Sequence, residues 1–282
     1  MTAAPNSPLS LATPLLLIGA GKMGGALLTG WLDNGLPADG VVVVDPHPSE
    51  AMQAFLAARG VRHETTVPAG LAPKVAVIAV KPQSMGEALP RLVAALTPAT
   101  MVVSIAAGTT VATFEAALGA RPVVRAMPNT PAQVGRGVSV LCANALASSD
   151  ARALATALLA TVGHVEWVED EGQIDAVTAV SGGGPAYVFL LVEALAAAAE
   201  KAGLPADLSM RIARETVSGS GELLARAAEP AAILRKNVTS PGGTTAAALK
   251  VLMGPQGDGG VFPLMEEAIA AATARSRELS RP

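Results

Sequence analysis

Ile18-Gly19-Ala20-Gly21-Lys22-Met23-Gly24 is the stretch that decides the fold of the first half of this chain. The apolar run at residues 15–18 predicts a buried strand before it, and apolar residues at helical spacing over 26–32 predict a helix after it. A strand, a G-x-G-x-x-G turn and a helix in this order form the context that a dinucleotide-binding fingerprint requires. The sequence therefore predicts a nucleotide site, and the alternative is an ordinary glycine turn.

Each glycine of this fingerprint has a physical reason. Gly19 permits the tight turn, Gly21 lets a pyrophosphate approach the backbone, and Gly24 lets the helix pack closely on the strand. The free N–H groups and the positive end of the helix dipole then face the phosphates. The residues predicted to bind a cofactor at this turn are Gly19, Ala20, Gly21, Lys22, Met23 and Gly24.

A second predicted strand, at residues 41–44, ends in Asp45. Asp45 follows the fingerprint by roughly 20 residues, the separation at which a carboxylate binds the 2′-hydroxyl of the ribose. The alternative is that Asp45 only opens a turn, because Pro46 and Pro48 could direct its carboxylate elsewhere. A carboxylate in the ribose position would repel a 2′-phosphate, so we expect appreciable use of NADH.

Composition limits the class of protein. The 282 residues suggest about two domains of ~100–200 residues each. A net charge of −3 and only 2% aromatic residues provide neither a basic field nor stacking platforms, so no nucleic-acid partner is expected. The single cysteine, Cys142, excludes an intramolecular disulfide and is typical of a reducing interior. We interpret Cys142 as a small buried apolar residue.

The remaining composition favours a cytoplasmic protein. Residues 1–13 are predicted to be a disordered lead, and they contain no basic residue of the kind that secretory or transit peptides carry. The longest uncharged stretches, such as 176–192, contain Gly and Pro, which we expect to interrupt any membrane helix. No membrane partner is therefore expected.

Strands alternate with helices in the first half, which predicts βαβ units, a parallel sheet and an α/β fold. Ligands bind at the carboxyl ends of strands in such sheets, and small residues or prolines follow three strands, at 79–82, 104–107 and 127–131. After the two strands already named, an extended piece is predicted at 61–62 and strands at 74–80, 101–105, 123–126, 138–142 and 165–168, with helices at 49–58, 85–96, 111–118 and 150–160.

The character of the sequence changes near residue 172, where Ala- and Leu-rich helical patterns replace the β-branched runs. We predict a first domain at 14–170 and an all-α domain at 171–282. The run 181–185, Ser-Gly-Gly-Gly-Pro, is expected to interrupt the first helix of this half. The predicted helices are 174–180, 186–202, 207–228, 231–237, 244–253 and 264–278.

A second glycine-rich turn lies in the helical half, at Asn237-Val238-Thr239-Ser240-Pro241-Gly242-Gly243-Thr244-Thr245. Consecutive glycines before a helix leave N–H groups pointing one way, which forms a nest for a small anion such as a carboxylate. The alternative is an inter-helix turn with Thr244 as N-cap. The three histidines, His47, His63 and His164, are scattered, so no metal site is expected.

Five motifs in one order resemble the pyrroline-5-carboxylate reductase family over residues 15–272. The resemblance implies an N-terminal Rossmann-type dinucleotide-binding domain and an all-α C-terminal dimerisation domain. It implies NAD(P)H-dependent reduction of 1-pyrroline-5-carboxylate to proline, the last step of proline biosynthesis, by a homodimer and often by a decamer. The motifs are Gly19-Ala20-Gly21-Lys22-Met23-Gly24, Ala79-Val80-Lys81-Pro82, Met127-Pro128-Asn129-Thr130-Pro131, Ser181-Gly182-Gly183-Gly184-Pro185-Ala186-Tyr187 and Asn237–Thr245.

The resemblance also implies roles for individual residues, with NADPH or NADH as cofactor. Asn237 would contact the cofactor from the helical half, and the Thr245 hydroxyl would approach the ring nitrogen of the substrate as the catalytic group. The residues implied on the nicotinamide side are Ala79, Val80, Lys81, Pro82, Ala106 and Ala107. Those implied at the substrate are Ser240, Gly242, Gly243, Thr244 and Thr245.

Two positions depart from the family pattern. Gly183 stands where the family has a serine, which removes a hydroxyl contact, and Lys236 stands where an aspartate is common. Two other functions are alternatives. One is another two-domain oxidoreductase of the β-hydroxyacid dehydrogenase type. Its candidate acid/base lysines are Lys201, Lys236 and Lys250, of which none has the G-x-x-x-K context of that class and Lys250 is the one to follow. The other is a nucleotide-sensing protein without turnover, which would not need the second turn.

Overall fold

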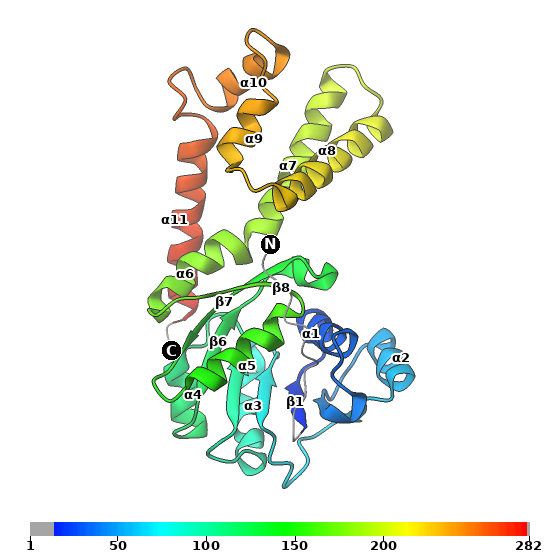
Figure 1. Cartoon of the computed structure of the whole chain (residues 1–282), viewed down its shortest axis with the longest axis vertical. Helices are drawn as coiled ribbons and strands as arrows, with labels where there is room; N and C mark the ends of the chain where they lie inside the picture. The colour runs from blue at the N-terminus through cyan, green and yellow to red at the C-terminus, as the bar shows by residue number, and fades with distance from the viewer. Residues whose placement is uncertain (1–13, 281–282) are drawn as a thin grey trace. The chain divides into compact units, whose positions relative to one another are not determined.

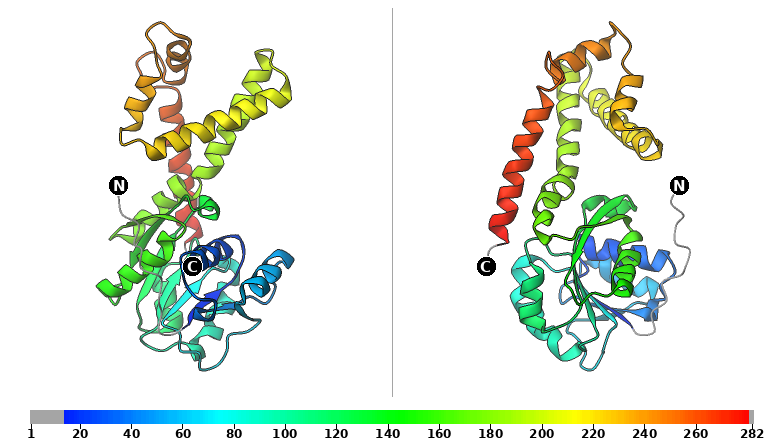
Figure 2. Two further views of the ribbon diagram at one scale, coloured as in Figure 1. Left: turned by 45° about the vertical axis from the view of Figure 1, so that its right-hand side comes forward. Right: turned by 60° about the vertical axis from the view of Figure 1, so that its left-hand side comes forward.

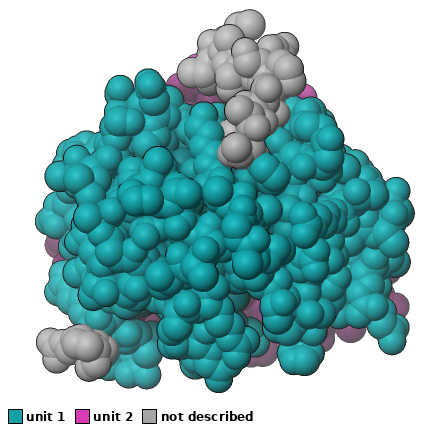
Figure 3. Space-filling view, turned by 90° about the horizontal axis from the view of Figure 1, so that it is seen from below, with its two compact units in different colours: residues 1–182, 273–282 teal, residues 183–272 magenta. Residues whose placement is uncertain are grey.

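The computed structural model describes residues 14–280, so the predicted disordered lead at 1–13 lies outside the described residues. The described chain divides into two compact units, one formed by residues 14–182 with 273–280 and the other by Gly183–Ala272, coloured teal and magenta in Figure 3. Helix α11 (Val261–Leu279) contributes residues to both units. The boundary expected between residues 170 and 171 precedes this division and stays a prediction.

The first unit is built on an eight-stranded sheet with the order β3-β2-β1-β4-β5-β6-β7-β8 (Figure 1). Its first six positions follow the strand order of a doubly wound dinucleotide-binding sheet. The Rossmann-type α/β fold expected for this half is therefore confirmed. The strands are β1 (Leu15–Ile18), β2 (Val41–Val44), β3 (Arg62–Glu64), β4 (Val75–Ile78), β5 (Met101–Ser104), β6 (Val123–Met127), β7 (Gly137–Ala143) and β8 (Gly163–Trp167).

The central strands are apolar at every position because helices cover both faces of the sheet (Figure 2). Successive side chains of β1 alternate between two core clusters, with Leu15 and Leu17 in one and Leu16 and Ile18 in the other. The first cluster also takes residues of α1 (Lys22–Asp33), α2 (Glu50–Arg59) and α5 (Ser149–Ala160). The second takes residues of α3 (Met85–Leu92), α4 (Val111–Leu118) and α6 (Ile174–Val177).

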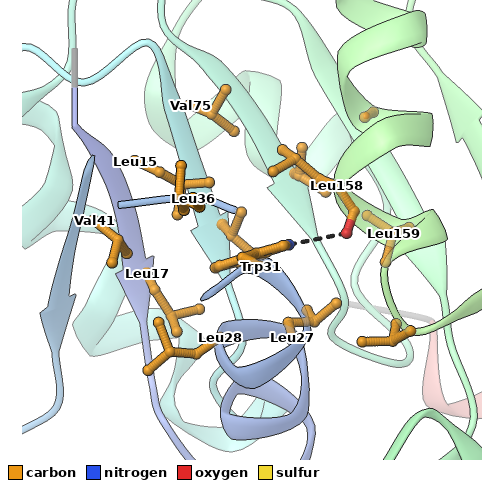
Figure 4. Packing of buried hydrophobic residues seen from close by; sticks show 14 of the residues in the cluster. Leu15, Leu17, Leu27, Leu28, Trp31, Leu36, Val41, Val75, Leu158 and Leu159 are labelled. Carbon is orange, nitrogen blue, oxygen red and sulfur yellow. Dashed lines mark hydrogen bonds between the residues drawn. The ribbon is translucent and has the colours of Figure 1, made fainter. Parts of the chain in front are cut away.

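Trp31 anchors α1 in the first of these clusters (Figure 4). Its side chain is fully buried, and its Nε1 donates a hydrogen bond of 2.9 Å to the Leu158 carbonyl oxygen on α5. The polar atom of the ring is thus satisfied while the ring packs beside Leu27 and Leu28. Removing a large buried ring of this kind costs about 3–5 kcal/mol, so Trp31 holds the helix that begins at the glycine turn.

The expectation of a parallel sheet is wrong for one strand pair. β6 and β7 pair antiparallel, whereas the other paired strands of the described sheet run parallel. The connection between them holds only a short 3-10 segment, η4 (Thr130–Val134), instead of a full helix. A parallel crossover needs a dozen or more residues, about the length of a helix with its loops, so this shorter connection reverses the strand direction.

The second unit is entirely helical in the described residues, as the sequence predicts. A break at Gly203, whose φ is +99°, separates its two longest helices. The helices that belong to it, wholly or in part, are α7 (Gly184–Lys201), α8 (Ala206–Arg226), α9 (Ala231–Asn237), α10 (Thr244–Leu252) and α11.

The run 181–185 changes the winding of a helix but does not end it. From Glu171 to Lys201 the chain passes through a 3-10 turn (η5, Glu171–Gln173), α6, a π turn (η6, Thr178–Gly182) and a bend at Gly183 into α7. Pro185 lies in the first turn of α7, where its missing N–H has no helical partner to lose. This segment is long and apolar enough to cross a membrane by length and composition, with a mean hydropathy of 1.4 in its most apolar window.

Candidate active site

The glycine turn joins the carboxyl end of β1 to the N-terminus of α1. Gly19 has a φ of +88°, and a Cβ there would lie 2.9 Å from the Ala79 carbonyl oxygen. A Cβ on Gly24 would collide with the Gly19 carbonyl oxygen. Only glycine fits these two positions, which have the tight turn and the close packing of helix on strand that the fingerprint predicts.

Gly21, between them, faces open space. It is the N-cap of α1, and a Cβ built on it meets no other heavy atom within 4 Å. The helix has no capping side chain and no acidic residue in its first turn, so its first N–H groups are left for another acceptor. A helix N-terminus in this state binds a pyrophosphate. The residues at this turn therefore fit a dinucleotide.

Asp45 lies at the carboxyl end of β2 beside the glycine turn. Its Oδ2 accepts a hydrogen bond of 2.8 Å from the Ala20 N–H, and its Oδ1 accepts one of 2.9 Å from the His47 N–H. The carboxylate is thus held against the turn, and Pro46 and Pro48 do not direct it away. Its binding to the ribose stays a prediction.

Two cavities open around Asp45, with volumes of about 940 and 700 Å³. Gly21, Asp45 and His47 line both of them. The larger cavity also contains Ala20 and Lys22. The smaller one adds, of the predicted cofactor residues, Gly19, Ala79, Val80 and Lys81. The structure therefore brings the glycine turn, Asp45 and the end of β4 together in the first unit.

Other predicted cofactor residues lie outside these two cavities. Met23 packs against the core, Gly24 is a buried residue of α1, and Pro82 begins a short 3-10 segment after β4. Ala106 is buried behind β5, whereas Ala107 is exposed on the loop that follows it. Asn237 is exposed at the end of α9 in the second unit. Their contacts to a cofactor stay predictions.

Several residues that line the smaller cavity were not predicted from the sequence. Thr65 and Thr66 follow β3 and face the cavity that Asp45 lines, together with Ser84 and Arg91. Their hydroxyl and guanidinium groups are suitable donors for a bound nucleotide. The sequence did predict an extended piece at 61–62, shortly before Thr65 and Thr66. A strand of three residues is too short to show an alternating pattern, so the sequence did not identify the two threonines as site residues.

The histidines have the roles expected of surface or satisfied residues. His63 Nε2 donates to the Asp45 carbonyl oxygen at 2.9 Å, and His164 pairs with Glu166 at 2.6 Å on the surface. Burial, with a smaller contribution from the Glu171 carboxylate, raises the pKa of Cys142 to about 11. The buried thiol therefore stays protonated near neutral pH. Within residues 14–280, no group of three or more His, Cys, Asp and Glu could hold a metal ion.

The motif after β6 and the motif around residue 181 meet through one side chain, Asn129. Its Nδ2 donates to the Ser181 carbonyl oxygen at 3.1 Å, and its Oδ1 accepts from the Val138 N–H at 2.9 Å. Ser181 lies in the π turn, where the change in helical hydrogen bonding frees carbonyl oxygens for other donors. Asn129 thus fixes the place where the helix changes its winding.

The second glycine-rich turn lies in the helical unit before α10. Gly242 has a φ of +72° with open space around its Cβ position, and Gly243 is the N-cap. The alternative with Thr244 as N-cap is wrong, since Thr244 is the first helical residue. The Gly243 N–H donates to the Ser240 carbonyl oxygen at 3.0 Å, so a bound carboxylate would have to share this amide.

The side chains predicted to bind substrate are exposed in this single chain. Ser240, Thr244 and Thr245 all lie on the surface, and the helix that Thr245 belongs to has no capping side chain. Its first N–H groups, like those of α1, are therefore open to an acceptor. The lysines weighed for the alternative oxidoreductase, Lys201, Lys236 and Lys250, are exposed as well.

A Rossmann-type sheet, a glycine turn with an uncapped helix and a carboxylate at the end of the second strand define a dinucleotide-binding protein of the Rossmann class. Residues 15–108 match the family described as NADP oxidoreductase, coenzyme F420-dependent, and residues 171–279 match the family described as pyrroline-5-carboxylate reductase dimerisation. The chain belongs to the pyrroline-5-carboxylate reductase family, as its relatives demonstrate.

The pyrroline-5-carboxylate reductase of Pseudomonas aeruginosa is 43% identical over 275 residues, covering 96% of this chain and 98% of the relative. A solved pyrroline-5-carboxylate reductase from Coxiella burnetii superimposes with a TM-score of 0.87 at 34% identity, over 96% of this chain and all of that one. The Plasmodium falciparum pyrroline carboxylate reductase, solved with NADP bound, has a TM-score of 0.77 at 27% identity, over 96% and 99% of the two chains.

Proposed function

We infer that this chain reduces 1-pyrroline-5-carboxylate to L-proline with a hydride from NADPH or NADH. The observation that carries this function is the full-length similarity at 43% identity to a pyrroline-5-carboxylate reductase, which spans both units. The geometry agrees with it, because one glycine turn suits a pyrophosphate and a second suits a small carboxylate.

The first unit would hold the cofactor through its backbone. The N–H groups at the start of α1 bind the pyrophosphate, and the end of β4, at Ala79 to Lys81, borders the adjoining cavity. When bound, the nicotinamide supplies the hydride, and the protein contributes orientation and electrostatics. Holding both reactants in one geometry supplies several kcal/mol of the roughly 7–11 kcal/mol that such positioning can contribute.

The second glycine turn would hold the substrate. The amides of Gly242 and of the first turn of α10 offer donors to its carboxylate, because no side chain caps this helix. The protonated cyclic imine already carries the positive charge that makes its carbon accept hydride, so no strong acid is required. We assign to the Thr245 hydroxyl a hydrogen bond to the ring nitrogen.

The choice between the two cofactors rests on Asp45. Its carboxylate lies beside the turn where the ribose is expected, and both oxygens already accept backbone hydrogen bonds that hold it there. A 2′-phosphate would meet this negative charge, so we propose appreciable activity with NADH. Measuring kcat/KM with each cofactor tests this. A preference for NADPH above about a hundredfold, or ~2.7 kcal/mol, would contradict the role of Asp45.

Apolar residues on the helical unit indicate self-association. On α7, Phe189, Leu190 and Leu191 are 61%, 62% and 51% exposed. Further apolar residues of α8 and α11 are exposed as well. We propose that a second copy of the chain covers them in a homodimer, with assembly up to a decamer. This reading also accounts for the apolar segment 171–201 without a membrane. Light scattering at low micromolar concentration should return at least a dimer, and an active monomer would overturn the proposal.

The partners and compartment follow from composition. We propose a cytoplasmic enzyme, since the sequence has a single cysteine, and one that binds no nucleic acid, since its net charge is −3. We also propose that it binds no membrane, since a second copy of the chain would cover the apolar segment 171–201. Flotation with anionic vesicles and fractionation of cells test both statements.

The reaction itself is tested by following NAD(P)H oxidation when 1-pyrroline-5-carboxylate is added to the purified protein. We expect proline as the product, with no turnover of pyruvate or of 3-hydroxyacid pairs. Turnover of a 3-hydroxyacid would favour the β-hydroxyacid dehydrogenase type instead. Tight dinucleotide binding without any hydride transfer would favour a nucleotide-sensing protein.

A further inference from the structure

An arginine is buried inside the sheet of the first unit. Arg125 lies on β6, is 4% exposed, and donates from Nη1 to Glu171 Oε1 at 2.7 Å. A surface ion pair contributes little to stability, but a buried charge that loses its partner is strongly destabilising. This pair therefore differs from the neighbouring pair of Arg152, on α5, with Glu169, whose side chain is 83% exposed.

The same carboxylate oxygen accepts a second hydrogen bond. The Val111 N–H donates to Glu171 Oε1 at 2.9 Å, and Val111 is the first residue of α4. A carboxylate at a helix N-terminus is also favoured by the helix dipole. One oxygen atom thus ties together the strand β6, the start of α4 and the 3-10 turn η5 that begins at Glu171.

Each of these three segments leads to a part of the predicted active site. β6 continues into the loop that carries Asn129, which holds the Ser181 carbonyl oxygen in the π turn. The helix α4 follows the loop with Ala106 and Ala107, expected beside the nicotinamide. The turn η5 continues through α6 to the same π turn. The ion pair therefore fixes the positions of the segments that lead to these regions. Arg125 itself is buried on β6 and lies outside them.

We propose that the Arg125–Glu171 pair is a positioning device for hydride transfer, which rests on the function proposed above. It holds the loop at 106–108 and the π turn in fixed places relative to the loop after β6, so that the nicotinamide meets a preformed surface. The glycine turn, whose hydrogen bonds do not involve Glu171, binds the dinucleotide without this pair.

The test compares three variants of the full chain. Glu171→Gln keeps an oxygen that can accept from Arg125 and Val111, Glu171→Met removes it, and Arg152→Met is the matched control that breaks the neighbouring exposed pair. We expect Glu171→Met to lower kcat by roughly ten- to a hundredfold, since a displacement of about 1 Å can cost this much. The dissociation constant of the dinucleotide, from fluorescence titration, should stay within about twofold.

The primary kinetic isotope effect is a second readout, and it separates a positioning role of the ion pair from a role in stability alone. With deuterated NAD(P)H, the primary isotope effect on kcat should rise in Glu171→Met, because hydride transfer becomes slower than the other steps. Glu171→Gln should recover most of the rate. Unchanged kcat in Glu171→Met, or an equal loss in Arg152→Met, would overturn the proposal.

Amide hydrogen exchange distinguishes failure of the positioning proposal from failure of the proposed function. The Val111 amide should exchange faster in Glu171→Met than in Arg152→Met, whatever the reaction is. Unchanged exchange overturns the positioning role even in an active enzyme. Faster exchange in a chain that oxidises no NAD(P)H would instead support the positioning of these segments and overturn the reaction.

Discussion

Two glycine-rich turns precede helices in this molecule, and they differ in what holds their shape. Around the turn before α1, a Cβ on Gly24 would collide with backbone, and the Gly19 N–H donates to the Val44 carbonyl oxygen at 2.8 Å. Around the turn before α10, a Cβ on Gly242 would meet no heavy atom within 4 Å. The first turn is enclosed by its own sheet, whereas the second is held by local hydrogen bonds, such as that from Thr239 Oγ1 to the Arg235 carbonyl oxygen.

The comparison shows that the same physical device, an uncapped helix start, can be built in two ways. In the first unit the strands and α1 leave no room for a side chain at Gly19 or Gly24, so substitution there disturbs the fold as well as the ligand, whereas a Cβ on Gly21 between them meets nothing within 4 Å. In the helical unit the turn is exposed, so substitution should change ligand binding and catalysis while the unit stays folded. The predictions below test this contrast.

Gly24→Ala should have the largest effect. Its methyl group has no room against the Gly19 carbonyl oxygen, so the backbone must shift, with a loss of about 1–3 kcal/mol in the free energy of unfolding. Dinucleotide binding should be lost at the same time. Chemical denaturation and fluorescence titration measure the two effects. Gly86→Ala on α3, where a Cβ meets nothing within 4 Å, is the control and should not destabilise the protein.

Gly21→Val should separate binding from folding within the same turn. Open space surrounds this position, so the fold should survive, while the side chain occupies the path of the pyrophosphate. We expect the dinucleotide affinity to fall by about a hundredfold or more, which is ~2.7 kcal/mol, with an unchanged circular dichroism spectrum. Retained affinity would mean that the fingerprint is an ordinary turn.

Thr245→Val should act on the second turn without changing its shape. Valine keeps the volume and removes the hydroxyl, so kcat and kcat/KM should fall together by roughly ten- to a hundredfold, or about 1.4–3 kcal/mol. Thr244→Val is the matched control, because we expect Thr244 to act through its amide. Wild-type turnover in Thr245→Val would show that Thr245 only packs the helix start.

Gly242→Val should raise KM by about tenfold, or ~1.4 kcal/mol, with a smaller change in kcat. A β-branched residue is strained at a φ of +72°, and its side chain would stand in the carboxylate nest. Gly60→Val, at a φ of +65° with open space at the end of α2, controls for the strain. An equal rise in KM in both variants would show that backbone strain, and not loss of the carboxylate nest, raises the KM.

The smallest expected effect is on the pH dependence of stability. It arises from Cys142, the single cysteine, which lies in the first unit. Burial raises its pKa from 9.0 to about 11, so above pH 9 the unfolded chain loses a proton that the folded chain keeps. This contribution to stability is complete below pH 9 and falls as the pH rises toward 11, by about 1 kcal/mol at pH 10. Urea denaturation of the wild type and Cys142→Ala at pH 8 and pH 10 measures it. An equal loss of stability in both proteins would contradict this origin.

The sequence by itself determined most elements of the first unit, because most of them carry a local signal. The apolar run 15–18, the glycine turn and the apolar run 41–44 become β1, the start of α1 and β2 with the expected bounds. The helix 111–118 has the same bounds in the structure, with Thr110 as its N-cap. Period and capping act over a few residues, so they can be read without knowing what lies nearby.

Only the tertiary structure decided the features that depend on distant residues. The direction of β7 followed from the short connection after β6, and the helix winds as a π turn over Thr178–Gly182, where Asn129 donates to the Ser181 carbonyl oxygen. The bond from Glu171 to Arg125 joins residues 46 positions apart. No local pattern encodes such contacts, because each depends on how the chain packs rather than on the propensity of neighbouring residues.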